Sequence, residues 1–381
     1  MIDVADRLNS VEEYYFSKKL REVNSLIADG KPIINLGIGS PDMQPPQKVI
    51  DALTEGLLNP VAHKYQSYQG LPELRQAIAG FYKNHYGVSL NSNTEVLPLM
   101  GSKEGIMHIS MAYLNKGDEV LIPNPGYPTY QSVTKLLEAK PVFYELDASN
   151  NWLPDLKTLA QSDLSKVKLM WVNYPHMPTG AVPNENVFED LVAFAKKHDI
   201  LIVNDNPYSF VLNDNPTSIL KVKGAKDVCL ELNSLSKTFN MAGWRVGMVV
   251  GNSAHINNIL KVKSNMDSGM FYGIQKGAIE ALKCSNMWFA TLNNVYRERR
   301  DLVWKLADAL HCTYDENATG LFVWAKLPAF IKAEEFIDSI LKKNHLFITP
   351  GTIFGSKGEG YIRFSLCAQT EDLEEAIARV K

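Results

Sequence analysis

The chain contains few cysteines and none of the paired spacings that build disulfide or zinc frameworks. Only four occur in 381 residues, far apart and without a C-x-x-C pair. Such cysteines are typical of small buried side chains in a reducing compartment. The chain also lacks an excess of either charge, since its formal net charge is −3. This balance gives no reason to expect a nucleic acid or an anionic membrane surface as a partner.

Targeting and membrane-spanning patterns are absent as well. Residues 1–7 lack the basic start and apolar run of a signal peptide. No apolar stretch approaches the ~20 residues needed to cross a bilayer. The sequence also lacks internal repeats, low-complexity tracts and long Gly/Ser linkers. We therefore expect a cytoplasmic globular protein, long enough for two domains at the usual ~100–200 residues each.

Short apolar runs alternate with amphipathic helical stretches through the middle of the chain. This order predicts a mostly parallel α/β sheet with helices on both faces. Strands are expected at residues 95–100, 119–122, 141–145, 169–173, 201–204, 228–232 and 246–250, and helices at 72–86, 103–113, 127–137 and 185–198. In such sheets ligands collect outside the carboxyl ends of the strands, where several polar residues of this chain are found.

The pattern changes from about residue 272. Long charged helices are followed by short strands and a final helix, which predicts a smaller α+β domain. We expect a large domain over residues 46–275. Residues 1–45 and 276–381 are expected to form an N-terminal arm and the small domain. A site at the interface of the two domains fits this pattern.

Segment 233–247 is the most informative part of the chain. It places Lys237 between the hydroxyls of Ser234 and Ser236 and the guanidinium of Arg245, directly after an apolar run. A lysine amine forms a Schiff base with a carbonyl and then serves as a proton shuttle. Hydroxyls and a guanidinium suit a phosphate held beside that amine. The combination describes a pyridoxal 5′-phosphate (PLP) site, whereas an isolated lysine would be read as a solvated surface residue.

This segment resembles the lysine motif of class I/II aminotransferases, the fold-type-I PLP enzymes, and is most similar to the aspartate and LL-diaminopimelate aminotransferase subgroup. The resemblance runs from about residue 36 to residue 364, with several motifs in the family's order. It implies a fold-type-I PLP transferase. That fold has a large domain with a mostly parallel seven-stranded sheet sandwiched by helices, and a smaller α+β domain.

Further residues match the positions at which this family holds its cofactor. The resemblance assigns Asp205 to the pyridine nitrogen, which a carboxylate keeps protonated, and Tyr208 to the ring oxygen. Tyr127 matches an aromatic side chain stacked on the ring. Ser102 and Lys103, at the start of a predicted helix, match amides that contact the phosphate. Taken alone, the tetrapeptide from Asp205 to Tyr208 favours a turn, and the Pro-Gly before Tyr127 indicates only a turn. An ordinary helix cap at Ser102 predicts nearly the same geometry as a phosphate site.

One position departs from the family pattern. Residues 172–180 resemble the family's Pro-x-Asn-Pro-Thr-Gly loop, but Met177 stands where that loop carries an asparagine that donates to the ring oxygen. A thioether is no donor. Tyr208 is then left alone for this hydrogen bond, unless His176 or water substitutes. We expect the Schiff base to lose its proton less readily than in relatives with the asparagine.

Other matches concern the substrate and a partner subunit. Arg363, in an alternating strand near the C-terminus, matches the family's α-carboxylate-binding arginine, and arginine binds carboxylates in bidentate fashion. A solvated arginine on an edge strand is the alternative. Gly39 matches a glycine whose backbone approaches the same carboxylate. Tyr65 matches a tyrosine that reaches the partner's cofactor phosphate, which implies a homodimer with shared sites; Ser268 is a further candidate for this contact.

The resemblance implies a PLP-dependent aminotransferase with ping-pong kinetics. It would move the amino group of an α-amino acid to a 2-oxo acid, with 2-oxoglutarate expected as acceptor. Lys237 would remove and return the α-proton, with Asp205 and Tyr208 as the other catalytic residues. A PLP-dependent β-lyase of the same fold is the first alternative. A ligand-binding regulator is disfavoured, because the N-terminal arm is too short and not basic enough for a DNA-binding segment.

The sequence leaves the substrate side chain open. Aspartate, alanine, an aromatic amino acid and a diaminopimelate derivative all remain as donors, because one arginine clamp suits every α-amino acid. Tyr14, Tyr15 and His108 are candidates for the side-chain pocket, and core packing explains them equally well.

Overall fold

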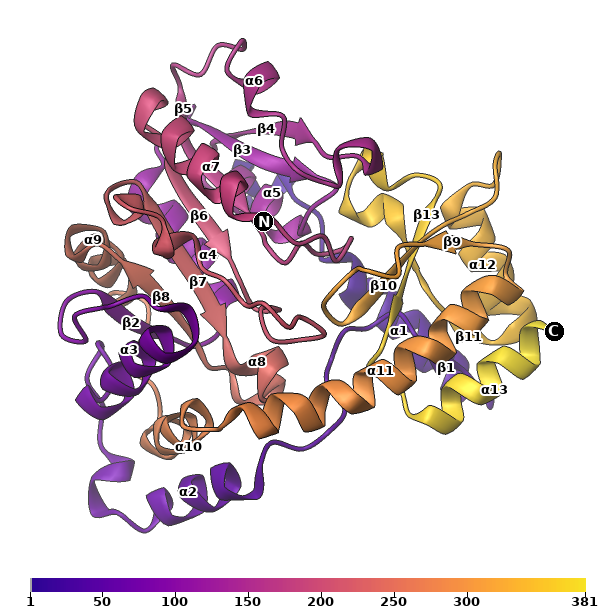
Figure 1. Ribbon diagram of the computed structural model, residues 1–381, viewed down its shortest axis with the longest axis horizontal. Coiled ribbons are helices and arrows are strands. Elements are labelled where there is room, and N and C mark those ends of the chain that lie inside the picture. The colour runs from indigo at the N-terminus through magenta and orange to yellow at the C-terminus, as the bar shows by residue number, and fades with distance from the viewer. Residues whose placement is uncertain (1) are drawn as a thin grey trace.

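A computed structural model describes residues 2–381. Its largest element is a seven-stranded sheet in the order β2-β8-β7-β6-β5-β3-β4 (Figure 1). The strands span Val96–Leu99 (β2), Glu119–Asn124 (β3), Lys140–Glu145 (β4), Val167–Val172 (β5), Leu201–Asp205 (β6), Cys229–Ser234 (β7) and Gly247–Gly251 (β8). Within this sheet β8 pairs antiparallel with both neighbours, and the remaining pairs are parallel. The predicted mostly parallel sheet is confirmed, with each strand end within two residues of its predicted position.

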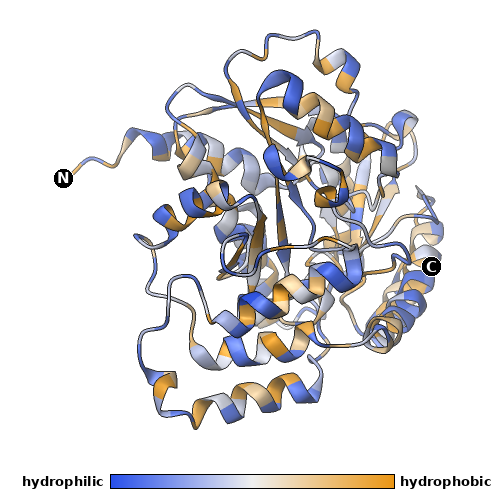
Figure 2. Cartoon of the chain, turned by 60° about the vertical axis from the view of Figure 1, so that its left-hand side comes forward, coloured by the Kyte–Doolittle hydropathy of each residue, from blue (hydrophilic) through white to orange (hydrophobic). Residues whose placement is uncertain are grey.

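Alternate side chains of the strands enter two different cores. Leu169 and Trp171 of β5 pack with helices α4, α5 and α9, whereas Met170 and Val172 pack with α3, α7 and α10. These helices span Pro72–Tyr86 (α3), Ser102–Tyr113 (α4), Pro128–Leu136 (α5), Glu185–His198 (α7), Ser253–Lys263 (α9) and Tyr272–Leu282 (α10). Apolar residues on both faces are what a parallel sheet between two helical layers requires. Figure 2 shows outer helices banded in hydrophobic orange and hydrophilic blue, as amphipathic helices are.

A smaller sheet in the order β12-β13-β10-β9 lies near the C-terminus. Its strands span Thr313–Tyr314 (β9), Phe322–Lys326 (β10), Thr349–Pro350 (β12) and Tyr361–Ser365 (β13). The helices of this part of the chain span Asn286–Ala309 (α11), Ala333–Asn344 (α12) and Thr370–Val380 (α13). The predicted boundary between residues 275 and 276 falls inside α10. The buried side chains of α10, as far as Leu282, join the core of the larger sheet.

The N-terminal arm joins the smaller sheet's side of the molecule (Figure 1). After α1 (Tyr15–Ala28), strand β1 (Ile34–Asn35) pairs in parallel with β11 (Leu346–Phe347). Val23 of α1 packs in one buried cluster with Leu341 and Phe347. The chain then crosses to α2 (Gln47–Leu57), which packs on α10. Short helices α6 (Leu156–Leu159) and α8 (Leu235–Thr238) complete the fold. Among residues 2–381, no helix combines the length and apolarity that crossing a membrane demands.

Candidate active site

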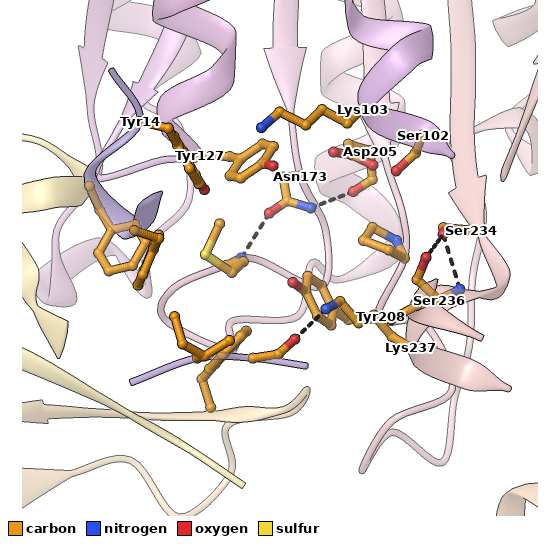
Figure 3. A pocket seen from close by; sticks show the side chains of 18 of the residues that line it. Tyr14, Ser102, Lys103, Tyr127, Asn173, Asp205, Tyr208, Ser234, Ser236 and Lys237 are labelled. Atoms are coloured by element: carbon orange, nitrogen blue, oxygen red, sulfur yellow. Dashed lines mark hydrogen bonds between the residues drawn. The ribbon is translucent and has the colours of Figure 1, made fainter. Parts of the chain in front are cut away.

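Eleven of the twelve predicted site residues line a single cavity of about 570 Å³. It lies at the carboxyl ends of the large sheet's strands, between that sheet, α1 and β13 (Figure 3). The eleven are Gly39, Ser102, Lys103, Tyr127, Asp205, Tyr208, Ser234, Ser236, Lys237, Arg245 and Arg363. Eight of them lie at or just after the ends of β2, β3, β6 and β7, which reach the same edge of the sheet. Arg245 precedes the antiparallel strand β8, Gly39 comes from the N-terminal arm and Arg363 from β13 of the smaller sheet.

Lys237 lies on α8, the single helical turn that follows β7. Ser234 caps this turn, accepting a hydrogen bond from the backbone amide of Ser236 at 3.1 Å. The Lys237 ammonium donates to the main-chain carbonyl of Gly39 across the cavity. Burial, with help from Arg363 and Arg245, lowers the pKa of Lys237 to about 8. The amine is therefore neutral more often than a solvated lysine at the same pH, and the neutral amine is the nucleophile and base.

Hydroxyls and a guanidinium surround the N-terminus of α4. The Ser234 hydroxyl donates to the Ser236 hydroxyl at 2.8 Å, and both side chains line the cavity with Ser102 and Arg245. Gly101, the residue before this helix, has a φ of +96°, and a Cβ there would lie 2.3 Å from the Arg245 guanidinium. The arginine thus packs directly over the backbone that leads into α4. Amides at a helix start, two serines and an arginine form a cradle for a phosphate.

Asp205 ends β6 with its side chain buried in the cavity. Its Oδ2 accepts a hydrogen bond from the Tyr130 hydroxyl at 2.9 Å, whereas its buried Oδ1 has no hydrogen-bond partner among the described residues. Burial raises the pKa of this carboxyl to about 6, opposed by the Tyr130 hydrogen bond. An unpartnered buried carboxylate oxygen is costly unless a cation or a donor meets it. A protonated ring nitrogen would be such a partner, so this site fits a pyridinium.

Two tyrosines complete the walls around this carboxylate. Tyr127 directly precedes α5, and its ring packs edge-on against Tyr130, with centroids 5.5 Å apart. Tyr208 packs against Phe322. Burial raises the pKa of both phenols. Both therefore keep their protons at neutral pH, and Tyr208 is available as a donor to a ring oxygen.

The loop around Met177 contains a site residue that the sequence analysis missed. Asn173 lines the cavity one residue beyond β5, donates to the Asp205 main-chain carbonyl and accepts from the Met177 amide at 2.9 Å. Its position after a strand, like that of Asp205, was the available signal. Met177 lines the cavity, and its sulfur accepts a hydrogen bond from Arg363 at 3.4 Å. His176 is buried against Thr179, 2.8 Å away, and is not among the lining residues within 2–381.

Arg363 is deeply buried, which contradicts the alternative of a solvated arginine on an edge strand. β13 is an interior strand, paired with β12 on one side and β10 on the other, and Arg363 is 4 % exposed. Its Nη2 donates to the Gly37 carbonyl at 2.8 Å, and its guanidinium lies 3.8 Å from the Phe322 ring centroid. Burial lowers its pKa to about 10, so it remains cationic at neutral pH. Position 39 needs a glycine, because a Cβ there would lie 2.3 Å from the Phe322 ring.

The remaining candidates lie elsewhere. Tyr65 is 90 % exposed and Ser268 is exposed on the surface of the chain. His108 is buried beside Glu104, 3.0 Å away, and with Tyr15 it is outside the set that lines the cavity within residues 2–381. Tyr14 does line the cavity. The sequence analysis missed eight further lining residues: Phe16, Ser17, Leu20, Ile38, Pro207, Ala242, Phe322 and Phe354.

Comparisons with known proteins agree with this geometry. Residues 31–380 match the family model for aminotransferase class I and II. LL-diaminopimelate aminotransferase from Nitratidesulfovibrio vulgaris is 41% identical over 381 residues, covering 99% of this chain and 98% of that protein. The enzyme of the same name from Aquifex aeolicus is 40% identical and covers 100% and 99%.

Solved structures give the same result. Apo-BacF from Bacillus subtilis superposes with a TM-score of 0.96 at 38% identity, covering 100% of this chain and 98% of that one. An aromatic aminotransferase from Pyrococcus horikoshii superposes with a TM-score of 0.89 at 29% identity, covering 98% and 96%. The family match spans both sheets and every residue that lines the cavity from Ile38 onward. The chain therefore belongs to the class I and II aminotransferase family and is a transaminase of the fold-type-I architecture.

Proposed function

We propose that this transaminase uses PLP to move the amino group of an α-amino acid to a 2-oxo acid by a ping-pong mechanism. One observation supports the proposal above all others. The Lys237 amine, the unpartnered oxygen of Asp205, the cradle at the start of α4 and the buried Arg363 face the same cavity. These are the groups that an aldehyde, a pyridine nitrogen, a phosphate and an α-carboxylate each require.

Each group has a distinct part in holding the cofactor. Lys237 would bind its aldehyde, Asp205 its ring nitrogen and Tyr208 its ring oxygen, with the Tyr127 ring against its face. The phosphate would lie in the cradle, whose members are Ser102, Lys103, Ser234, Ser236 and Arg245. When bound, the cofactor supplies an electron sink for the charge that develops at the substrate α-carbon.

The chain's own residues then position the substrate and move its proton. Arg363 holds the α-carboxylate in bidentate fashion, beside the backbone of Gly39, and so fixes the direction of the α-hydrogen. The freed Lys237 amine takes that proton as general base and returns it as general acid. The lowered pKa of Lys237 favours the neutral amine that this step needs.

A panel of amino donors tests the proposal. The protein loaded with PLP should convert an amino acid alone to its oxo acid in an amount equal to the enzyme, and turn over only when a second 2-oxo acid is added. A β-lyase would instead release pyruvate and ammonia catalytically from the amino acid alone. That outcome would contradict the proposal. The relatives at about 40% identity bear the name LL-diaminopimelate aminotransferase. The panel therefore includes that donor, with 2-oxoglutarate as the first acceptor tried.

Met177 gives a spectroscopic prediction. A donor on the ring oxygen draws off negative charge and loosens the proton shared with the Lys237 nitrogen. Because a thioether donates nothing, Met177→Asn should lower the pH midpoint of the visible absorbance change by roughly one unit, as expected for one added hydrogen bond to a charged group. Met177→Leu, which has a similar volume and no donor, should leave the midpoint in place. An unchanged midpoint in the asparagine variant would rule the idea out.

We further propose a homodimer with shared sites. Three side chains here are exposed to solvent: Tyr65 by 90 %, Leu58 by 83 % and Met266 by 58 %. The segment that contains Tyr65 and the segment that contains Met266 are in contact, since a Cβ on Gly269 would lie 2.4 Å from the Gln66 carbonyl oxygen. Exposed apolar side chains on adjoining segments are typical of a surface that a second subunit covers. The cytoplasmic location expected from the sequence stays a prediction.

The dimer leads to a prediction about Tyr65. In a chain that sediments as a dimer, Tyr65→Phe should raise the dissociation constant for PLP roughly tenfold, because one hydrogen bond to a charged phosphate is lost. Tyr68→Phe, at a neighbouring tyrosine that is 45 % exposed, is the matched control and should change it little. Equal effects of the two substitutions, or a monomeric chain, would contradict shared sites.

A further inference from the structure

The part of the cavity beyond the cofactor-holding residues has a largely apolar lining, with Tyr14 and Ser17 as its polar members on the α1 side. Phe16 and Leu20 of α1 face Ile38, Phe322 and Phe354 across it. The Arg363 guanidinium lies among three of these rings, 3.8 Å from the centroid of Phe322, 4.7 Å from that of Phe354 and 5.5 Å from that of Phe16. A substrate carboxylate held by Arg363 would therefore place its side chain against aromatic and aliphatic groups.

Contacts at both ends hold α1 over the cavity. The ring of Tyr14, just before the helix, lies 4.2 Å from the Lys103 ammonium and packs 5.7 Å from the Phe16 ring. Further along, Val23 is buried with Leu341 and Phe347. Residues 16 and 20 are one helical turn apart, so both point to the same side of α1. Phe16 and Leu20 thus belong to a helix that contacts the rest of the protein at both of its ends.

Among the charged groups that line the cavity, only Lys103 would be left to pair with a polar substrate side chain. Within residues 2–381 these charged groups are Lys103, Asp205, Lys237, Arg245 and Arg363. Under the proposed function, Asp205, Lys237 and Arg245 serve the cofactor and Arg363 the α-carboxylate. Lys103 follows the start of α4, but its ammonium lies over the Tyr14 ring, directly before α1, and the face of that ring is its partner.

A distal carboxylate would therefore be buried without a second arginine. The distal ammonium of a diaminopimelate donor would meet no carboxylate except that of Asp205. Polar groups that are buried without partners bind poorly, whereas large apolar side chains gain from leaving water.

We propose that the side-chain pocket formed by Phe16, Leu20, Ile38, Phe322 and Phe354 selects amino acids with a large apolar side chain, aromatic ones above all. This inference rests on the proposed function, and it assigns Phe16 and Leu20 as specificity-determining residues. Both halves of a ping-pong reaction use one pocket, so the same preference applies to the acceptor. Phenylpyruvate should then be a better acceptor than 2-oxoglutarate.

Unreactive acids measure the pocket without turnover. With the PLP-loaded enzyme, 3-phenylpropionate should bind roughly tenfold or more tightly than glutarate by calorimetry, the discrimination that one apolar pocket typically provides. Phenylalanine should exceed glutamate and LL-diaminopimelate in the half-reaction by a similar factor. Tighter binding of glutarate would overturn the proposal. If Lys103→Met then abolished that binding, the distal carboxylate would be assigned to Lys103.

Substitutions on α1 identify the residues responsible. Leu20→Arg should weaken the binding of 3-phenylpropionate and strengthen the binding of glutarate, so that the order of the two affinities is reversed. Ile27→Arg makes the same chemical change on the same helix at a side chain that is 48 % exposed and outside the cavity lining, and should change neither. Phe16→Ala adds no charge, and it should weaken the binding of 3-phenylpropionate without changing the binding of glutarate. Wild-type affinities in both pocket variants would overturn the assignment.

Failure of the two proposals can be told apart. If the proposed function fails, the protein does not acquire the visible absorbance of bound PLP or does not transaminate any donor. If only the pocket assignment fails, the enzyme is coloured and active but prefers glutarate and glutamate.

Discussion

Replacing Lys237 with alanine should lower the transamination rate by roughly 10⁴-fold, because the general acid-base step and the covalent attachment are lost together. The structure gives the reason in two parts. Lys237 faces the same cavity as Asp205 and Arg363, and burial lowers its pKa to about 8. Borohydride reduction of the wild-type enzyme should fix the cofactor to Lys237, as peptide mass analysis would reveal. The alanine variant should yield no such adduct.

Two controls make this result specific. Lys237→Arg keeps a cation in the cavity but removes the nucleophile, so it should be as inactive as the alanine variant. Lys223→Ala changes an exposed lysine and should leave both the rate and the adduct intact. A reduced adduct on any other lysine would contradict the assignment of the covalent site.

Asp205→Asn should have the second largest effect. An asparagine can still accept the Tyr130 hydrogen bond, which is 2.9 Å long in the native chain, so the fold should survive. It cannot supply the negative charge that keeps a ring nitrogen protonated. We expect the transamination rate to fall by roughly 10²–10³-fold, the usual cost of losing one electrostatic group aimed at developing charge. Tyr130→Phe keeps the carboxylate and should retain most of the activity.

Asp205 also predicts how stability depends on pH before the cofactor binds. Its folded pKa of about 6 lies above its ordinary value of 3.8. Between these values the folded chain holds a proton that the unfolded chain has released, so stability falls as the pH rises from about 4 to about 6. The loss from this group is roughly 3 kcal/mol above pH 6.

Urea unfolding of the cofactor-free protein at several pH values measures this contribution. Glu231 is also buried with a raised pKa, so the comparison between wild type and Asp205→Asn isolates Asp205. In Asp205→Asn, the free energy of unfolding should not show the part of the decline between about pH 4 and pH 6 that Asp205 causes. Cofactor binding pairs the carboxylate with a cation, and PLP affinity should therefore weaken below pH 6. Identical pH profiles for the two proteins would contradict the raised pKa.

Local signals explain why the main elements could be predicted from sequence. Helix α3 begins with Pro72 at its first turn and ends at Gly87, whose φ is +70°. Helix α7 begins after Asn184, whose side chain accepts from the Val187 amide. Both helices have the predicted bounds because proline, asparagine and glycine mark these ends physically. Strand β1 was not predicted, because two residues that pair with β11 far along the chain leave no periodic pattern.

The candidate site was predictable where residues follow strand ends. Tyr127, Asp205 and Lys237 come after three of the apolar runs, and parallel strands bring such positions to one edge of the sheet. The apolar lining was not predictable. Phe16 and Leu20 read as the buried stripe of an amphipathic helix, and only the tertiary placement of α1 distinguishes a core face from a ligand-facing one. The division into domains and the roles of the site residues stay predictions.

The return of the arm to β11 has a mechanical consequence. β1, the buried end of α1 and the Gly37 carbonyl that accepts from Arg363 all belong to one segment of chain. The segment is joined to the smaller sheet where the Ser365 amide of β13 donates to the Leu36 carbonyl at 2.7 Å. A swing of the smaller sheet relative to the larger one that breaks the contact between Tyr14 and Lys103 would therefore carry α1 and the guanidinium together. The distance between the Arg363 guanidinium and the apolar side chains of Phe16 and Leu20 would then stay constant while the opening of the cavity widens or narrows.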